Sequence, residues 1–116
     1  QISVMEVNDD SIEKYGVVEL HRHTNKVLGL IEKPKKEVAP SNLASIGRYV
    51  LNPEIFEILR HQKPGKAGEI QLSDAINAEA KSDNVEAVTL AGKRFDCGSV
   101  EGFVEATTYF QRNKSY

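Results

Sequence analysis

The chain has 116 residues, of which 40% are hydrophobic and 28% are charged, and its formal net charge is -2. This length suits one domain or part of a larger one, and the near balance of 15 basic and 17 acidic side chains argues against nucleic-acid binding. The apolar runs are too short to span a membrane, and the single cysteine, Cys97, excludes an internal disulfide framework.

Four strands are predicted in the first half of the chain, because β-branched and other apolar residues there are separated by polar turns. They are Ile2–Val7, Tyr15–Leu20, Val27–Glu32 and Leu43–Leu51. The second and third are joined by a short polar segment, which predicts a hairpin. The chain begins with Gln1 directly before the first strand, with no signal peptide in front, so we expect that a preceding part has been lost.

The first helix is predicted after Asn52, which would cap it, with Pro53 at the first helical position and Glu54 at the positive end. Its apolar side chains recur at helical spacing, at Ile55, Phe56 and Leu59. The segment Lys63–Gly65 ends it. A loop is expected at 64–69, since its two glycines and lysine lack the spacing of a phosphate-binding loop.

The second half of the chain is predicted to contain more helix than strand. A second helix starts near Ser73 and runs through Ala80, a strand covers Val85–Leu90, and Lys93–Phe95 extends or pairs with that strand. The last helix begins at Ser99 as its cap. Its apolar face is expected to comprise Val100, Phe103, Val104, Thr107 and Phe110. The pattern indicates an α/β or α+β fold in one unit.

Glu32, Lys33 and Pro34 form the first group of residues that could act on a ligand. The Glu32 carboxylate and the Lys33 ammonium lie at the end of a predicted strand, and they point to opposite faces because strand side chains alternate. Glu32 could accept hydrogen bonds from sugar hydroxyls while Lys33 meets a phosphate. An exposed, solvated strand end is the alternative interpretation, and it is the usual situation of charged residues.

The second group is Phe95-Asp96-Cys97-Gly98-Ser99. An aspartate between a strand and a helix lies where open α/β sheets bind ligands, and a hard divalent cation prefers such an oxygen ligand. The alternative is a simple turn, since Asp, Gly and Ser also favour turns and caps.

Taken in order, six segments of the chain resemble bacterial UTP–glucose-1-phosphate uridylyltransferases. The segments are Lys14–Val18, Ile31–Pro34, Ala39–Ala44, Gly47–Leu51, Gly68–Ala75 and Arg94–Gly98, and the resemblance runs from about Gln1 to Arg112. Each motif is weak alone, but their order and spacing together are specific.

The resemblance implies an α/β fold: the C-terminal part of a nucleotide-diphospho-sugar transferase, Rossmann-like, with a mixed and mostly parallel sheet flanked by helices. It implies transfer of uridylyl from UTP to glucose 1-phosphate, with Mg2+ as cofactor. By the same resemblance, Gly16 would contact the glucose through its backbone, Glu32 would bind glucose hydroxyls and Lys33 would bind the sugar phosphate. Asp96 would be one of two aspartate ligands of the magnesium ion. No role follows for Glu69 to Asp74.

The chain departs from this family in one large respect: the family's glycine-rich nucleotide loop, its uracil contacts and its other magnesium aspartate are absent. We therefore expect residues 1–116 to be the C-terminal portion of a single nucleotidyltransferase domain, inactive by itself. The full-length protein is expected to be a cytoplasmic homo-oligomer that binds neither nucleic acid nor membranes.

Two alternatives stay open from the sequence. One is another sugar-1-phosphate nucleotidyltransferase, with a different nucleotide. The other is a non-catalytic α/β module for oligomerisation or carbohydrate binding, in which the apolar face of the last helix docks on a partner chain.

Overall fold

The computed structural model describes residues 1–65 and 68–113. Five strands form one sheet: β1 (Ile2–Glu6), β2 (Gly16–Leu20), β3 (Val27–Glu32), β4 (Leu43–Tyr49) and β5 (Ala87–Thr89). Three α-helices accompany them: α1 (Ile55–His61), α2 (Leu72–Ala80) and α3 (Val100–Arg112). Two short 3-10 helices, η1 (Asp9–Lys14) and η2 (Lys36–Val38), lie in the connections. In the described part of the chain, no helix is long and apolar enough to cross a membrane.

The sheet has the strand order β3-β2-β4-β1-β5. Strands β2 and β3 are antiparallel neighbours, which confirms the predicted hairpin. The pairs β2–β4 and β1–β4 are also antiparallel, whereas β1 and β5 are parallel. The expected mixed sheet is therefore confirmed, but the expectation that it would be mostly parallel is wrong for the described residues, in which three of the four strand pairs are antiparallel.

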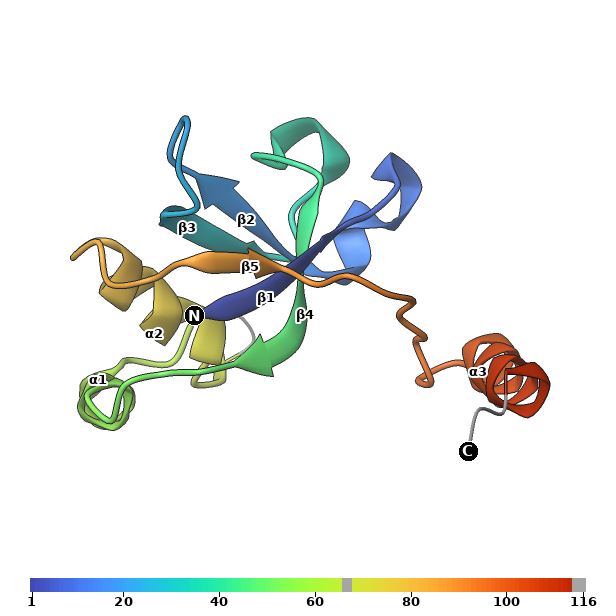
Figure 1. Cartoon of the computed structure of the whole chain (residues 1–116). Coiled ribbons are helices and arrows are strands. Elements are labelled where there is room, and N and C mark those ends of the chain that lie inside the picture. The colour runs from blue at the N-terminus through green and yellow to red at the C-terminus, as the bar shows by residue number, and fades with distance from the viewer. Residues whose placement is uncertain (66–67, 114–116) are drawn as a thin grey trace.

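The sheet curls, so that the hairpin of β2 and β3 approaches the strand at the opposite end of the strand order (Figure 1). The Val27 amide donates to the Val85 carbonyl at 2.9 Å, and the Ala87 amide donates to the Asn25 carbonyl at 2.8 Å. These hydrogen bonds satisfy backbone groups that an open sheet would leave to solvent. The result is a curved half-barrel that holds the hairpin against β5.

The hydrophobic core lies inside this curve, where α2 covers the sheet. It comprises Ile2, Val4, Val18, Val27, Leu30, Ile76, Ala80, Val85 and Ala87, all of them buried. Ile76 and Ala80 are four residues apart and so share one face of α2. This apolar face positions α2 against β3, and the first turn of the helix then lies beside the end of that strand.

The side chain of Asn77 links α2 to β3 through the two backbone hydrogen bonds that a neighbouring strand would otherwise make. Its Oδ1 accepts a hydrogen bond from the Leu30 amide and its Nδ2 donates to the Leu30 carbonyl, both at 2.6 Å. β3 is at one end of the strand order, so these backbone groups have no strand beside them. The side-chain amide supplies the missing donor and acceptor.

We expect Asn77→Ala to lower the free energy of unfolding by about 2–3 kcal/mol, because two partly buried backbone groups of Leu30 lose their partners. Urea unfolding of the chain, followed by circular dichroism, measures this loss. Asn113→Ala is the matched control, since its amide only donates to the Tyr109 carbonyl at the exposed end of α3. Equal losses for the two variants would contradict the role of Asn77.

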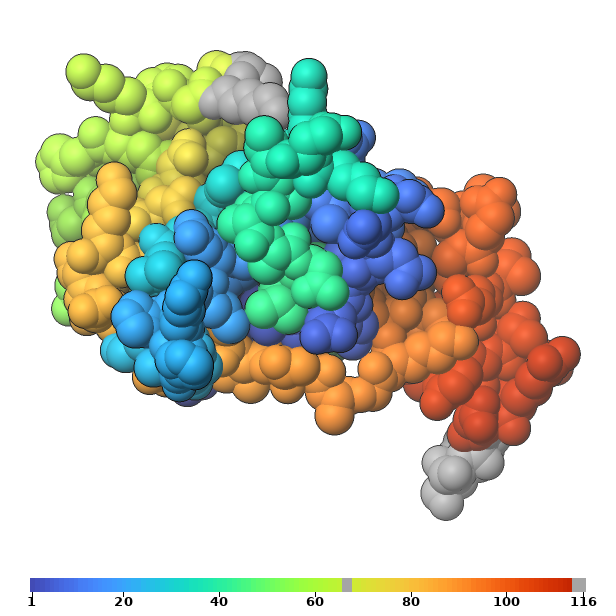
Figure 2. Space-filling view, turned by 90° about the horizontal axis from the view of Figure 1, so that it is seen from above, coloured from blue at the N-terminus to red at the C-terminus, as the bar shows by residue number. Residues whose placement is uncertain are grey.

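The helix α3 lies apart from the other two helices, at the far end of the molecule (Figures 1 and 2). Its predicted start is confirmed, because the Ser99 hydroxyl accepts from the Gly102 amide at 3.1 Å. The helix contacts the preceding segment through Phe95, whose ring centroid is 5.2 Å from that of Tyr109. The expected apolar face is not buried in the described chain: Val100 is 77% and Phe103 is 61% exposed.

Two local predictions are wrong. Asn52 does not cap the first helix with its side chain and Pro53 is not its first residue; α1 begins at Ile55, whose amide donates to the Asn52 carbonyl. Lys93–Phe95 is not a strand, because β5 ends at Thr89 and this segment instead packs against α3. The expected loop at 64–69 includes residues 66 and 67, which lie outside the described residues.

Candidate functional site

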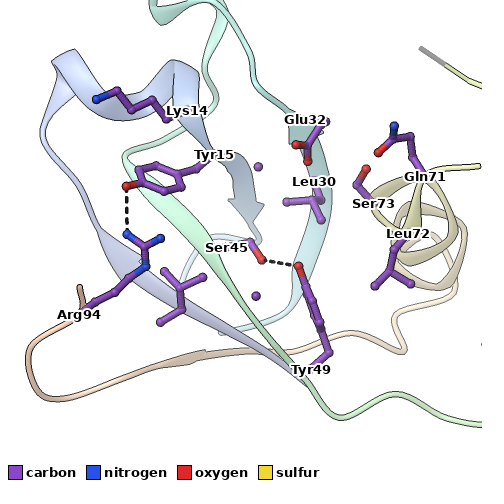
Figure 3. A pocket seen from close by; sticks show the side chains of 13 residues that line it. Lys14, Tyr15, Leu30, Glu32, Ser45, Tyr49, Gln71, Leu72, Ser73 and Arg94 are labelled. Atoms are coloured by element: carbon purple, nitrogen blue, oxygen red, sulfur yellow. Dashed lines mark hydrogen bonds between the residues drawn. The ribbon is translucent and has the colours of Figure 1, made fainter. Parts of the chain in front are cut away.

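A cavity of about 340 Å³ opens where β2, β3 and β4 meet the first turn of α2 (Figure 3). Its size is at the lower end of the range for small-molecule sites. Its polar and charged lining residues are Lys14, Tyr15, Glu32, Ser45, Tyr49, Gln71, Ser73 and Arg94. Hydroxyl groups, the Arg94 guanidinium and one carboxylate therefore border the same space.

Gly16 and Glu32 are brought together at this cavity by the register of the hairpin, which pairs them across β2 and β3. A Cβ atom on Gly16 would lie 3.1 Å from the Glu32 Oε2 and 3.1 Å from the Leu30 Cδ1. These distances are tighter than ordinary van der Waals contacts. The lack of a side chain at Gly16 therefore makes room for the half-buried Glu32 carboxylate and leaves backbone accessible beside it.

Lys33 follows Glu32 but is exposed and is not among the described residues that line the cavity. Its φ of 46° falls in the left-handed region, which is uncommon for a residue with a side chain. Its amide donates to the Tyr15 carbonyl at 3.0 Å, which extends the hairpin by one hydrogen bond. The unusual backbone turns the chain at this point, and the buried Pro34 follows.

Asp96 also lies outside the described cavity lining, and its side chain is 53% exposed. Its Oδ1 accepts a hydrogen bond from the Gly98 amide at 3.1 Å, which is the local turn that such residues favour. Its Oδ2 is 3.6 Å from the Arg94 Nη2. Both interpretations of the sequence thus remain compatible with its position: a turn residue, and an accessible carboxylate near the cavity.

Arg94 connects the cavity with Asp96, and the sequence interpretation assigned it no role. Its Nη1 donates to the Tyr15 hydroxyl at 2.9 Å, and its guanidinium carbon is 4.8 Å from the centroid of the Tyr15 ring (Figure 3). Its Nη2 faces Asp96. The only sequence signal was its place in the Arg94–Gly98 segment, because Tyr15 is 79 positions away.

The chemistry of the cavity suits a small ligand that carries both hydroxyl groups and negative charge. Glu32 can accept hydrogen bonds from hydroxyls, and serine and tyrosine hydroxyls can both donate and accept. Arg94 provides positive charge on the opposite side from Ser73 and Glu32, whereas the ammonium group of Lys14 points away from the cavity (Figure 3). Among the described residues, no group of three or more His, Cys, Asp or Glu side chains could hold a metal ion by itself.

The curved mixed sheet and this cavity define an α/β domain with a polar site at the ends of its strands. The chain belongs to the nucleotidyl transferase family, whose model matches residues 1–113. The resemblance inferred from the six sequence segments is thereby confirmed at the level of the family.

Relatives and solved structures agree with this membership. The chain is 45% identical over 115 residues to a UTP–glucose-1-phosphate uridylyltransferase of Pseudomonas aeruginosa, covering 97% of the chain and 41% of the relative. It is 40% identical over 108 residues to a putative enzyme of the same name from Methanocaldococcus jannaschii, covering 90% and 38%. It superimposes with a TM-score of 0.88 on a crystal structure of UDP-glucose pyrophosphorylase complexed with UDP-glucose, at 44% identity, covering 97% of this chain and 44% of that one. The chain thus spans about two fifths of the length of the curated relatives it matches.

Proposed function

We propose that this chain forms the sugar-phosphate side of an enzyme that transfers uridylyl from UTP to glucose 1-phosphate, giving UDP-glucose and pyrophosphate. The observation that carries the proposal is the cavity in which the Gly16 backbone and the Glu32 carboxylate lie opposite Arg94. Relatives of that name match nearly the whole chain, which supports the choice of substrates.

In the proposed reaction, a phosphate oxygen of glucose 1-phosphate attacks the α-phosphorus of UTP, and the bond to the pyrophosphate leaving group breaks. Both reactants are anionic, so cationic groups reduce their repulsion and stabilise the charge on the transferring group. Glu32 and Gly16 hold the hexose, and Lys33 holds its phosphate. Because the protein supplies no covalent intermediate, most of the rate enhancement comes from positioning.

We include Mg2+ in the proposal, with Asp96 as one of its ligands. The half-exposed Asp96 carboxylate fits this role, since magnesium is commonly held by one or two carboxylates together with substrate phosphates. The Asp96 carboxylate lies 3.6 Å from Arg94, so a bound metal ion and Arg94 would both interact with this carboxylate. When bound, magnesium would neutralise phosphate charge.

We further propose that residues 1–116 are the C-terminal portion of one nucleotidyltransferase domain, with the nucleotide side contributed by sequence that this chain does not contain. The match to about 41% of a curated relative supports this division. The longer protein is proposed to be a cytoplasmic homo-oligomer.

The test is a chimera in which the part of the Pseudomonas aeruginosa relative outside the match is joined to this chain. We expect it to release pyrophosphate from UTP and glucose 1-phosphate in a coupled assay, whereas the 116-residue chain alone releases none. Equal or faster turnover with another nucleoside triphosphate would favour a different sugar-1-phosphate nucleotidyltransferase. An inactive, correctly folded chimera would contradict the proposal and favour a binding module.

Gly16→Ala in the chimera tests the shape of the sugar site. The added Cβ would push against the Glu32 carboxylate and Leu30, so we expect KM for glucose 1-phosphate to rise about 3- to 10-fold with a smaller change for UTP. Gly29→Ala is the matched control in the same hairpin, because its Cβ would meet only the Asn77 Oδ1 at an ordinary 3.7 Å. If both variants keep the parental KM, Gly16 does not shape the site.

A further inference from the structure

Ser73 lies in the first turn of α2 and lines the cavity, yet its hydroxyl is not used by the fold. The residue is 8% exposed, and its Oγ has no hydrogen-bond partner among the described residues. A buried hydroxyl without a partner costs free energy, so native structures nearly always pair such groups with protein, water or a ligand. The partner of Ser73 must therefore come from outside the described chain.

The helix does not need this hydroxyl in order to begin. The Asp74 and Ala75 amides donate to the Gln71 carbonyl at 3.2 and 3.4 Å, so the backbone supplies the bonds of the first turn. A serine that served only as a cap would instead accept a hydrogen bond from a nearby amide, as Ser99 does at α3. Ser73 thus lies at the start of the helix, but its hydroxyl does not make the hydrogen bond to a backbone amide that a capping serine makes.

The surroundings of Ser73 indicate what would bind to it. Ser73 and Gln71 lie on the same side of the cavity as Glu32, across from Tyr15 and Arg94 (Figure 3). Glu32 as a carboxylate can only accept hydrogen bonds, whereas a serine hydroxyl can also donate one. Each hydroxyl of a sugar both donates and accepts, so a hexose beside this wall could use both residues.

We propose that Ser73 binds a hydroxyl of the hexose moiety of glucose 1-phosphate and is a specificity-determining residue for the sugar. This inference rests on the proposed function, since it concerns the same cavity and the same substrate. A site that hydrogen-bonds a substrate hydroxyl rejects analogues that lack it, because the polar group of the protein is then left unpaired. Ser73 and Glu32 together would select a fully hydroxylated hexose.

The kinetic test compares Ser73→Ala with the parent chimera, using glucose 1-phosphate and its 2-, 3-, 4- and 6-deoxy analogues. We expect kcat/KM for glucose 1-phosphate to fall about 5-fold, from the loss of one neutral hydrogen bond. For the one analogue that lacks the contacted hydroxyl, the substitution should have no effect. KM for UTP should stay unchanged. Ser82→Ala, at the exposed C-terminal side of α2, is the matched control and should change none of these values.

Ser73→Cys separates the hydrogen bond from the volume of the side chain. A thiol fills the space of the hydroxyl but is a weak donor and acceptor, so this variant should discriminate among the analogues as poorly as Ser73→Ala. The unfolding midpoint of Ser73→Ala in urea, without ligand, should equal or exceed that of the parent chain, because an unpartnered buried group is removed. A lower midpoint would reveal a structural partner and overturn the inference.

The two proposals fail in different ways. An active chimera in which Ser73→Ala weakens every analogue equally would leave the proposed function intact and overturn the role of Ser73. If the chimera is inactive, calorimetric titration of glucose 1-phosphate into the 116-residue chain and its Ser73→Ala variant decides. Weaker binding to the variant supports the inference, whereas equal binding, or no binding to either chain, overturns it and leaves a bound water as the partner.

Discussion

Replacing Asp96 by alanine is expected to lower the turnover of the proposed enzyme by about 100- to 1,000-fold, because a proposed ligand of the metal that would neutralise phosphate charge is lost. The apparent affinity for Mg2+ should fall together with turnover. Steady-state assays of the chimera over a series of Mg2+ concentrations measure both quantities.

Two control variants separate this role from the turn that Asp96 also forms. Asp96→Asn keeps an oxygen that accepts from the Gly98 amide but removes the charge, so it should fold as well as the parent and still lose most of its turnover. Asp10→Ala removes an almost fully exposed carboxylate that is distant from Asp96 in the sequence, so it should not change turnover or Mg2+ dependence. Unchanged turnover and unchanged Mg2+ dependence in Asp96→Ala would refute the metal role.

Lys33→Ala is expected to raise KM for glucose 1-phosphate about 10- to 100-fold, because the proposed charge-assisted hydrogen bond to the sugar phosphate is lost. KM for UTP should change far less. Initial-rate kinetics with each substrate varied in turn distinguish the two effects. Lys33 directly follows Glu32 in the sequence and is exposed, so its flexible side chain is free to contact a ligand phosphate.

The controls for Lys33 use the basic run in which it lies. Lys33→Met keeps the length of the side chain without its charge and should behave like the alanine variant. Lys35→Ala removes an exposed lysine two positions later and should keep the parental KM. Equal weakening of glucose 1-phosphate and UTP by Lys33→Ala would show that the residue does not recognise the sugar phosphate specifically.

Local patterns in the sequence predicted most of the elements. The hairpin of β2 and β3 follows from two β-rich segments around a short polar turn, and His23 in that turn has a φ of 67°. Ser99 was recognised as a cap because capping is a contact between residues three positions apart. Such features depend on neighbours in the chain, so the chain alone reveals them.

Contacts between distant segments were not predictable in this way. The amide of Asn77 meets Leu30 across 47 positions, and Arg94 meets Tyr15 across 79. The apolar pattern of α3 predicted an amphipathic helix but not whether its face would be covered, since that depends on which surface lies opposite. An apolar face identifies a helix, but it does not identify the partner of that helix.

The candidate site was partly predictable for the same reason. The pairing of Gly16 with Glu32 follows from the hairpin register, but the functional meaning of that pair came from the resemblance to a family. Arg94 and Ser73 were missed because an isolated arginine before a turn and a serine at a helix start are common in any sequence. Only the cavity, which brings together residues from three strands and a helix, distinguishes them.

The side-chain amide of Asn77 also has a consequence for how the molecule behaves in a concentrated solution. An unpaired strand at the margin of a sheet is a template onto which another chain can add by β-augmentation, and this is a common route to aggregation. In the middle of β3, the side-chain amide of Asn77 already occupies the backbone amide and carbonyl of Leu30, so an added strand could not pair there. At the opposite margin, β5 has only three residues, and the Asn25 carbonyl already occupies the amide of Ala87. The curved sheet thus protects both of its margins against the addition of a strand from another chain.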